Sequence, residues 1–287
     1  VQANREMDGL LRDGVAVEFE ATAGARSGQR VTERVRVIDW DAPSPAEERN
    51  EFLAVSQLWL RGERGWRRPD VLLYVNGLPL VFIELKNSNV ALKAAYDDNL
   101  TNYRAELPQL FSANALCVLS NGIETRVGSL TAEWQHFFAW LRVDDEKEAL
   151  DRAALAENAL SIERMVLGLL APARLLDYVE NFVVFCRETH KLVAQNHQFL
   201  GVNRAFDAFT RRRELRGRLG VFWHTQGSGK SFSMVFVVRK VFRKLAGNFS
   251  FVVVTDRDDL DGQIYRNFLH TGTVAPKDEV QPRDSAQ

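Results

Sequence analysis

The chain has 287 residues, of which 46% are hydrophobic and 26% charged, and its formal net charge is −1. This composition supplies a packed core and excludes a disordered chain. The near-zero charge also excludes a protein that holds nucleic acid by a global positive field, so a nucleic-acid partner would have to meet local basic patches. No run reaches the ~18 consecutive apolar residues that span a bilayer, and no secretory signal is visible. We therefore expect a cytoplasmic protein with no membrane partner.

Strand patterns dominate the first part of the chain. Apolar and polar residues alternate in 15–19 and 31–37, on either side of a turn-like segment, and a further strand is predicted within 50–60. A basic, glycine-punctuated loop follows at 61–68. The apolar runs 71–75 and 78–86 are separated only by Asn-Gly, which predicts a hairpin because both residues tolerate positive φ.

The rest of the chain is predicted to be mixed. Helical spacing covers 91–104, a short buried strand is expected at 115–120, and most of 151–215 has helical character. Residues 220–223 and 248–255 are predicted strands on either side of a helix over 231–245. Strand, loop, helix and strand in this order form one βαβ unit, which implies a parallel sheet. The predicted division is residues 1–145 as a first domain, 146–215 as a helical linker region and 216–287 as the beginning of a second domain.

The first candidate site consists of Asp70, which follows Pro69, together with Glu84 and Lys86. Two carboxylates supply the hard oxygen ligands that Mg²⁺ prefers, and such an ion stabilises a scissile phosphate and activates water. Lys86 is two residues from Glu84 on a strand, so both side chains share a face. Charges in an otherwise apolar strand carry a high desolvation cost. The pattern therefore favours a metal-dependent nuclease site, and the alternative is a solvated hairpin whose charges pair with one another.

Register complicates this site. A two-residue turn at Asn76-Gly77 pairs Asp70 with Ile83, which would point Asp70 away from Glu84. We therefore predict a bulge or similar irregularity near Pro69-Asp70. Asn99 and Tyr103 lie four apart on the next predicted helix, so they share a face and are candidates to reach DNA or the lysine; an ordinary helix surface explains their spacing nearly as well.

The second candidate site is a glycine-rich loop between a predicted strand and a predicted helix. Backbone N–H groups in such a loop bind anionic oxygens at the helix N-terminus. Lys230 would reach the β- and γ-phosphates of a nucleotide, and the Ser231 hydroxyl would ligate Mg²⁺. His224 stands where the usual first glycine of the pattern falls, and Gln198 is a candidate to read an adenine edge. The predicted nucleotide-binding residues are Gln198, Thr225, Gly227, Ser228, Gly229, Lys230 and Ser231.

The order of these motifs resembles the restriction (R) subunits of type I restriction–modification enzymes. The resemblance rests on three stretches and covers about residues 50 to 270. They are RPDVLLYVNGLPLVFIELK at 68–86, FWHTQGSGKS at 222–231 and VVTDRDDLDGQ at 253–263. It implies an α/β fold, with a PD-(D/E)xK nuclease domain (a mixed central sheet flanked by helices) followed by the start of a RecA-like P-loop motor domain of superfamily 2.

The resemblance also carries expectations for individual residues. The family has a glutamine-x3-tyrosine motif after the nuclease core; Tyr103 fits it, and Asn99 stands where glutamine is expected. For the acidic residue of the family's first helix, the candidates are Glu18, Glu20 and Glu51. The acidic DEAH-like motif would lie beyond Gln287, and since the chain opens on valine instead of methionine, we expect a piece of a larger protein.

The implied function is ATP-dependent restriction: cleavage of double-stranded DNA with Mg²⁺, coupled to DNA translocation driven by ATP. The implied cofactors are ATP and Mg²⁺, with Asp70, Glu84 and Ser231 as metal ligands. The implied partners are double-stranded DNA and the methylation and specificity subunits. Two alternatives stay open: another superfamily 2 helicase–nuclease, for repair or a different restriction type, and a non-catalytic ATP-gated scaffold with a decayed nuclease fold. The DNA target, the cleavage distance and the subunit stoichiometry do not follow from the sequence.

Overall fold

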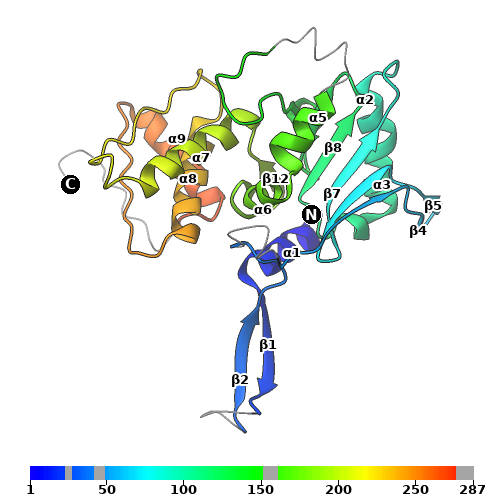
Figure 1. Ribbon diagram of the computed structural model, residues 1–287, viewed down its shortest axis with the longest axis horizontal. Helices are drawn as coiled ribbons and strands as arrows, with labels where there is room; N and C mark the ends of the chain where they lie inside the picture. Colours follow the sequence, from blue (N-terminus) through cyan, green and yellow to red (C-terminus); the bar gives the residue numbers. More distant parts are fainter. Residues whose placement is uncertain (23–27, 42–48, 151–160, 276–287) are drawn as a thin grey trace.

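A computed structural model describes residues 1–22, 28–41, 49–150 and 161–275. Helix α1 (Gln2–Asp13) is followed by a two-stranded antiparallel hairpin of β1 (Val15–Glu20) and β2 (Arg30–Val35), which stands away from the rest of the molecule (Figure 1). The predicted N-terminal strands are confirmed, although they form their own hairpin and do not join the central sheet. Each helix in the described residues is too short or too polar to pass through a bilayer.

The centre of the fold is a mixed six-stranded sheet in the order β10-β9-β8-β7-β6-β3. Strands β7 and β8 run parallel and the other neighbours run antiparallel. The parallel pair is joined by one helical crossover that changes from α to π and back. The strands are β3 (Phe52–Ser56), β6 (Val71–Val75), β7 (Leu78–Leu85), β8 (Leu116–Ser120), β9 (Thr125–Gly128) and β10 (Phe138–Ala139), and the crossover helices are α2 (Leu92–Ala94), η3 (Ala95–Leu100) and α3 (Thr101–Glu106).

A one-residue bulge interrupts the β6–β7 hairpin. Val75 pairs with Leu78 and Tyr74 with Pro79, but Leu73 pairs with Val81, so Leu80 is an extra residue on β7. An irregularity was predicted near Pro69-Asp70; it exists, but it lies beside the turn. Proline at 79 cannot donate a ladder hydrogen bond, which suits it to this irregular position.

The two faces of the sheet bury separate apolar clusters. One face carries Leu72 and Phe82, which pack with Tyr103 and Phe111 beneath the crossover helices. The other face carries Ile83 and its neighbours, which share a larger core with the C-terminal part of the chain. Since side chains alternate along a strand, Asp70 and Glu84 belong to the crossover-helix face, with Leu72 and Phe82.

The C-terminal part contains helices and one small hairpin. Of the segment 151–215 that was predicted to be mostly helical, 151–160 lie outside the described residues and 161–215 is mostly helical, although the β11–β12 hairpin was not anticipated. Its elements are α5 (Ser161–Met165), η6 (Val166–Leu170), α6 (Pro172–Asn181), β11 (Val183–Cys186), β12 (His190–Val193), α7 (Asn196–Thr210), α8 (Lys230–Lys244) and α9 (Asp258–His270).

The predicted strands at 220–223 and 248–255 were wrong for this structure. Both segments lack strand hydrogen bonding, so no parallel sheet forms in the described residues of 216–275. Val221, Val252 and Val254 remain largely exposed. Apolar pattern alone does not make a strand, because parallel strands depend on paired neighbours and on cover over both faces. The helix predicted at 231–245 is confirmed as α8.

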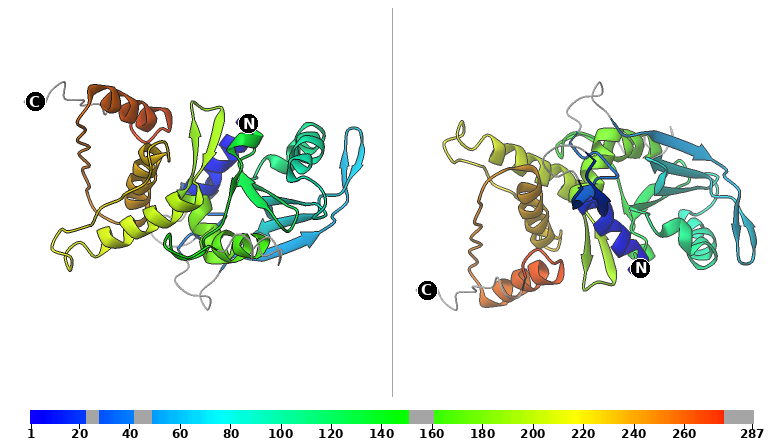
Figure 2. Two further views of the ribbon diagram at one scale, coloured as in Figure 1. Left: turned by 90° about the horizontal axis from the view of Figure 1, so that it is seen from above. Right: turned by 90° about the horizontal axis from the view of Figure 1, so that it is seen from below.

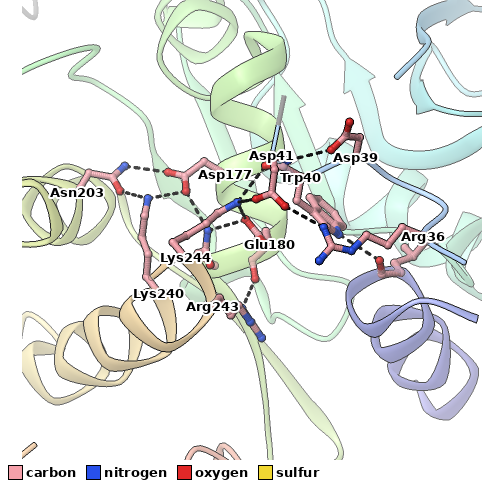
Figure 3. Close-up of polar contacts among 12 residues, drawn as sticks. Arg36, Asp39, Trp40, Asp41, Asp177, Glu180, Asn203, Lys240, Arg243 and Lys244 are labelled. Carbon is pink, nitrogen blue, oxygen red and sulfur yellow. Dashed lines mark hydrogen bonds and ion pairs between the residues drawn. The ribbon is translucent and has the colours of Figure 1, made fainter. Parts of the chain in front are cut away.

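Helix α8 is fixed to the rest of the molecule by ion pairs that are partly or largely buried on the lysine side (Figure 3). Lys240 donates to Asp177 on α6 and to Asn203 on α7, and its ammonium lies over the rings of Phe182 and Phe206. One turn further on, Lys244 pairs with Glu180 on α6 and with Asp41. Helix α8 is thus tied to α6, to α7 and to the segment that follows β2.

Removing Lys240 should loosen this attachment. We expect Lys240→Ala to lower the free energy of unfolding by about 2–3 kcal/mol, since it breaks a buried pair, although the partly exposed Asp177 limits the loss. Urea denaturation followed by circular dichroism measures the change. The control is Lys93→Ala, whose pair with Asp97 is exposed and should contribute about 0.5 kcal/mol or less. Equal effects of the two variants would contradict the attachment.

Candidate functional site

Asp70 and Glu84 come together on one face of the sheet. The pairs Val71–Ile83 and Leu72–Phe82 define the register beyond the bulge, and one further step places Asp70 opposite Glu84. Asp70 Oδ2 accepts a hydrogen bond of 2.8 Å from the backbone N–H of Leu85, which holds its carboxylate at the end of β7. The charge of Asp70 raises the pKa of Glu84, so the two carboxylates share one electrostatic environment.

Glu84 is the most constrained residue of the site. Glu84 is only 3% exposed to solvent, and its Oε1 accepts a hydrogen bond of 3.1 Å from Lys86 Nζ. Oε2 is buried and has no hydrogen-bond partner among the described residues. Burial, and after it Asp70, raises the pKa of Glu84 to about 7, against the opposing effect of Lys86. A buried, unpartnered carboxylate oxygen beside a second carboxylate fits a divalent cation that prefers oxygen ligands.

Tyr103 belongs to the same site. Its ring packs edge-on against Phe82, with 5.2 Å between the ring centroids, and it lines a pocket together with Arg68. Burial, with Glu84 and Asp70 nearby, raises the pKa of Tyr103 to about 12, so the phenol stays protonated at neutral pH. Asn99 and Tyr103 line one pocket, which confirms that they share a face of the helix.

The three candidates for a further acidic residue do not join this site. Glu18 and Glu20 lie on β1, in the hairpin that stands apart from the sheet (Figure 1). Glu51 is exposed before β3, where its backbone N–H donates to Asn76. Among the residues that the structure describes, no three His, Cys, Asp or Glu side chains lie close enough together to hold a metal ion. The strand pattern that carries Glu18 and Glu20 already argued against a helical position.

The glycine-rich loop forms the N-terminus of α8. Gly227 and Gly229 have φ of 79° and 77°, the left-handed conformation that glycine adopts without strain, and Gly229 is the N-cap residue directly before α8. Lys230 Nζ donates to the backbone oxygens of His224 and Thr225 at 2.9 Å each. The lysine therefore folds back over its own loop, with Ser231 beside it in the first turn of α8.

Gln198 lies against this loop, as a shared site requires. Its Nε2 donates to the backbone oxygen of Gly229 at 2.9 Å, and its Oε1 caps α7 by accepting from the N–H of Gln195. A Cβ on residue 229 would come within 2.7 Å of this amide, so the contact requires glycine. The amide of Gln198 thus has partners on both sides, and a role in reading adenine remains a prediction.

Two contacts of the loop were not anticipated, one with Glu146 and one with His197. His224, which departs from the usual glycine, bonds Glu146 Oε1 through Nε2 at 2.8 Å and packs against the ring of His197. His197 in turn contacts the backbone oxygen of Ser228. The departure at His224 was the available signal, but Glu146 is 78 residues away in sequence and no pattern linked the two.

The carboxylate site and the glycine-rich loop lie far apart in the molecule. Strands β6 and β7 belong to the sheet on one side, whereas α8 and α9 form the opposite end (Figures 1 and 2). Any coupling between the two sites must therefore pass through the body of the protein.

Comparisons with known proteins match both parts of the chain. Residues 1–136 match the family model of the type I restriction enzyme R protein N terminus, and residues 197–286 match the SWI2/SNF2 ATPase model. The chain is 40% identical over 298 aligned residues to the type I restriction enzyme HindI endonuclease subunit of Haemophilus influenzae, covering 100% of this chain and 27% of that protein. It is 31% identical over 292 residues to the putative type I restriction enzyme MjaIXP endonuclease subunit of Methanocaldococcus jannaschii, covering 94% of this chain and 27% of that protein.

The chain belongs to the family of type I restriction enzyme R proteins and corresponds to their N-terminal part. It spans about a quarter of the length of these relatives.

The raised pKa of Glu84 predicts a pH-dependent stability. The folded chain binds this proton more tightly than the unfolded chain, whose carboxyl has a pKa of 4.5. The stabilisation is therefore complete below about pH 4.5 and is lost as the pH rises to about 7, a change of about 3 kcal/mol. Urea denaturation in EDTA should show this fall in the wild type and a flatter profile in Glu84→Gln. The exposed Glu33→Gln should keep the wild-type profile, and identical profiles for Glu84→Gln and the wild type would contradict the burial argument.

Proposed function

We propose that this chain carries the nuclease site and the nucleotide-binding loop of an ATP-dependent type I restriction endonuclease. The observation that supports the nuclease assignment is the convergence of Asp70, Glu84 and Lys86, with an unpartnered oxygen of Glu84 buried beside Asp70. The first domain would then be a PD-(D/E)xK nuclease, and the second would be the start of a RecA-like motor.

Each residue of the carboxylate site has a defined part in this proposal. Bound Mg²⁺ would stabilise charge on the scissile phosphate and lower the pKa of an attacking water. Asp70 and Glu84 would hold the ion, and its charge would keep Glu84 ionised despite burial. Lys86, 3.1 Å from Glu84, would orient the water or neutralise the phosphate. Tyr103 stays protonated and would donate a hydrogen bond beside the carboxylates.

The glycine-rich loop would bind ATP. Lys230 would leave the carbonyls of His224 and Thr225 for the β- and γ-phosphates, while Gly227, Ser228 and Gly229 shape the loop around them. Ser231 would ligate the Mg²⁺ that accompanies the nucleotide. The SWI2/SNF2 ATPase match over 197–286 supports a role in ATP-driven movement along DNA.

The partners follow from the same assignment. The relatives are named as endonuclease subunits of type I restriction enzymes. We infer that this chain acts on double-stranded DNA together with methylation and specificity subunits, which would supply recognition of the target sequence. Other superfamily 2 helicase–nucleases remain the alternative, but no observation favours them over this assignment.

Glu84→Ala should abolish DNA cleavage without unfolding the protein. Loss of a metal ligand removes several kcal/mol of stabilisation, so the rate should fall by at least about 100-fold, whereas removing a costly buried charge should not destabilise the fold. The measurement is plasmid cleavage with Mg²⁺ and ATP by the complex assembled from full-length subunits. Glu33→Ala, an exposed carboxylate on β2, is the control. Cleavage by Glu84→Ala at the wild-type rate would overturn the nuclease assignment and favour a non-catalytic scaffold.

Lys230→Ala should abolish ATP turnover in the same complex. The lysine is the charge that meets the β- and γ-phosphates, and no other lysine lies in the loop. Phosphate release in the presence of target DNA measures the effect, with the exposed Lys147→Ala as the matched control. Retained turnover would remove the nucleotide-binding assignment of the loop.

A further inference from the structure

A small hairpin next to the carboxylate site concentrates arginine and tryptophan. Strands β4 (Leu60–Gly62) and β5 (Gly65–Arg67) form it, and the segment 58–68 holds four arginines and one glutamate in a chain whose net charge is −1. Trp59 and Trp66 are 58% and 59% exposed. The hairpin projects from the edge of the molecule (Figure 1). Large exposed aromatic rings among positive charges are costly on a surface that binds nothing.

The register of the hairpin arranges these side chains in a regular way. Arg61 pairs with Trp66, and one further step pairs Trp59 with Arg68, whose guanidinium lies 5.1 Å from the Trp59 ring centroid. Since side chains alternate across a strand, all four share one face, with each tryptophan opposite an arginine. This face therefore presents aromatic surface and positive charge side by side.

The alternate positions of the hairpin fix it to α3. Arg67 forms a two-pronged ion pair with Glu106, which is buried at the end of that helix. A Cβ on Gly62 would come within 2.9 Å of the Glu106 backbone oxygen, so the strand lies directly on the helix terminus. Leu60 packs on the apolar cluster beneath the helix. The tryptophan–arginine face is thus held on a rigid support.

A pocket of about 360 Å³ lies between this hairpin and the crossover helix. Its lining comprises Trp59, Trp66, Arg67 and Arg68 from the hairpin and its flank, and Asp98, Asn99 and Asn102 from the helix. Tyr103 also lines the pocket, and the charges of Glu84 and Asp70 contribute to the raised pKa of its phenol. Arg68, which lines the pocket, is two residues before Asp70 in the sequence, so the pocket lies close to the carboxylate site.

We propose that this hairpin and pocket bind one unstacked nucleotide of the DNA strand beside the carboxylate site. The inference rests on the proposed nuclease function. Tryptophan stacks on any base, and arginines neutralise the adjoining phosphates. Asp98, Asn99 and Asn102 supply acceptors and donors that suit a base edge, while the charge of Asp98 keeps phosphate on the arginine side. The site would hold the strand in place and would distort the duplex where it is cut.

The chain contains a second exposed hairpin that serves as a control. Strands β1 and β2 also form an isolated antiparallel pair, but they carry three glutamates against two arginines, with Phe19 exposed. Phe19→Ala and Arg30→Ala thus match the loss of an aromatic and of an arginine without touching the pocket.

DNA affinity tests the proposal independently of cleavage. Trp59→Ala/Trp66→Ala and Arg61→Ala/Arg64→Ala are introduced into full-length Glu84→Gln protein, and binding is measured by fluorescence anisotropy on single-stranded, gapped and intact duplex oligonucleotides. Loss of base stacking should weaken single-stranded and gapped binding by about tenfold or more, with a much smaller effect on the intact duplex. The arginine variant should weaken binding to all three and reduce its salt dependence. The two control variants should bind as the Glu84→Gln parent does.

Each outcome decides the proposal. Unchanged affinity of the tryptophan variant overturns it, and so does an equal loss on intact duplex, which would indicate groove contact without an unstacked nucleotide. Loss of circular dichroism signal would mark a folding defect; Trp59→Phe/Trp66→Phe, which keeps an aromatic surface, must then restore affinity for the proposal to stand. If the hairpin variants lose binding while Glu84→Ala still cleaves, the nuclease assignment fails and the nucleotide site remains.

Discussion

The carboxylate site depends on one extra residue in a hairpin. Without Leu80 as a bulge, the Asn76-Gly77 turn would place Asp70 opposite Ile83 and send its side chain to the other face of the sheet. With the bulge, Asp70 lies on the same face as Leu72, Phe82 and Glu84, beneath the crossover helices. The same shift leaves Leu80 and Val81 together in the larger core. A local backbone irregularity therefore serves both the chemistry and the packing.

Burial gives Glu84 its chemical character. The apolar neighbours that make β7 a central strand also remove water from this carboxylate, and Asp70 adds like charge. Lys86 donates a hydrogen bond to only one of the two carboxylate oxygens of Glu84. A cation between the carboxylates would satisfy the other oxygen and cancel the repulsion, so the cost of burying Glu84 would be recovered only when the site is filled. A carboxyl whose pKa is raised by burial and by a neighbouring charge is typical of functional sites.

Much of the part that contains the central sheet could be predicted from sequence because its signals are local. The Asn-Gly turn, the apolar runs of β6 and β7 and the helical spacing over 91–104 each correspond to observed elements. The position of the bulge could not be predicted, because register depends on packing across the sheet rather than on the turn alone. The strands expected at 220–223 and 248–255 failed for a related reason: their apolar pattern was correct, but a strand needs paired neighbours. Contacts such as Glu146 with His224 join distant segments, which a single sequence does not reveal.

The division into a first domain and a linker at residue 145 or 146 does not coincide with a gap in the core. Trp140 lies before that boundary and packs its ring against Tyr178 on α6 and Phe199 on α7, and all three share one apolar cluster with Val81 of β7 and Phe236 of α8. A polypeptide that stopped at residue 145 would leave this indole, and the part of the sheet that Leu11, Ile38 and Trp40 do not cover, open to water. The sheet that carries the carboxylates thus acquires much of its cover on that face from the helices that precede the glycine-rich loop, so the two parts of the chain are expected to fold and to unfold together.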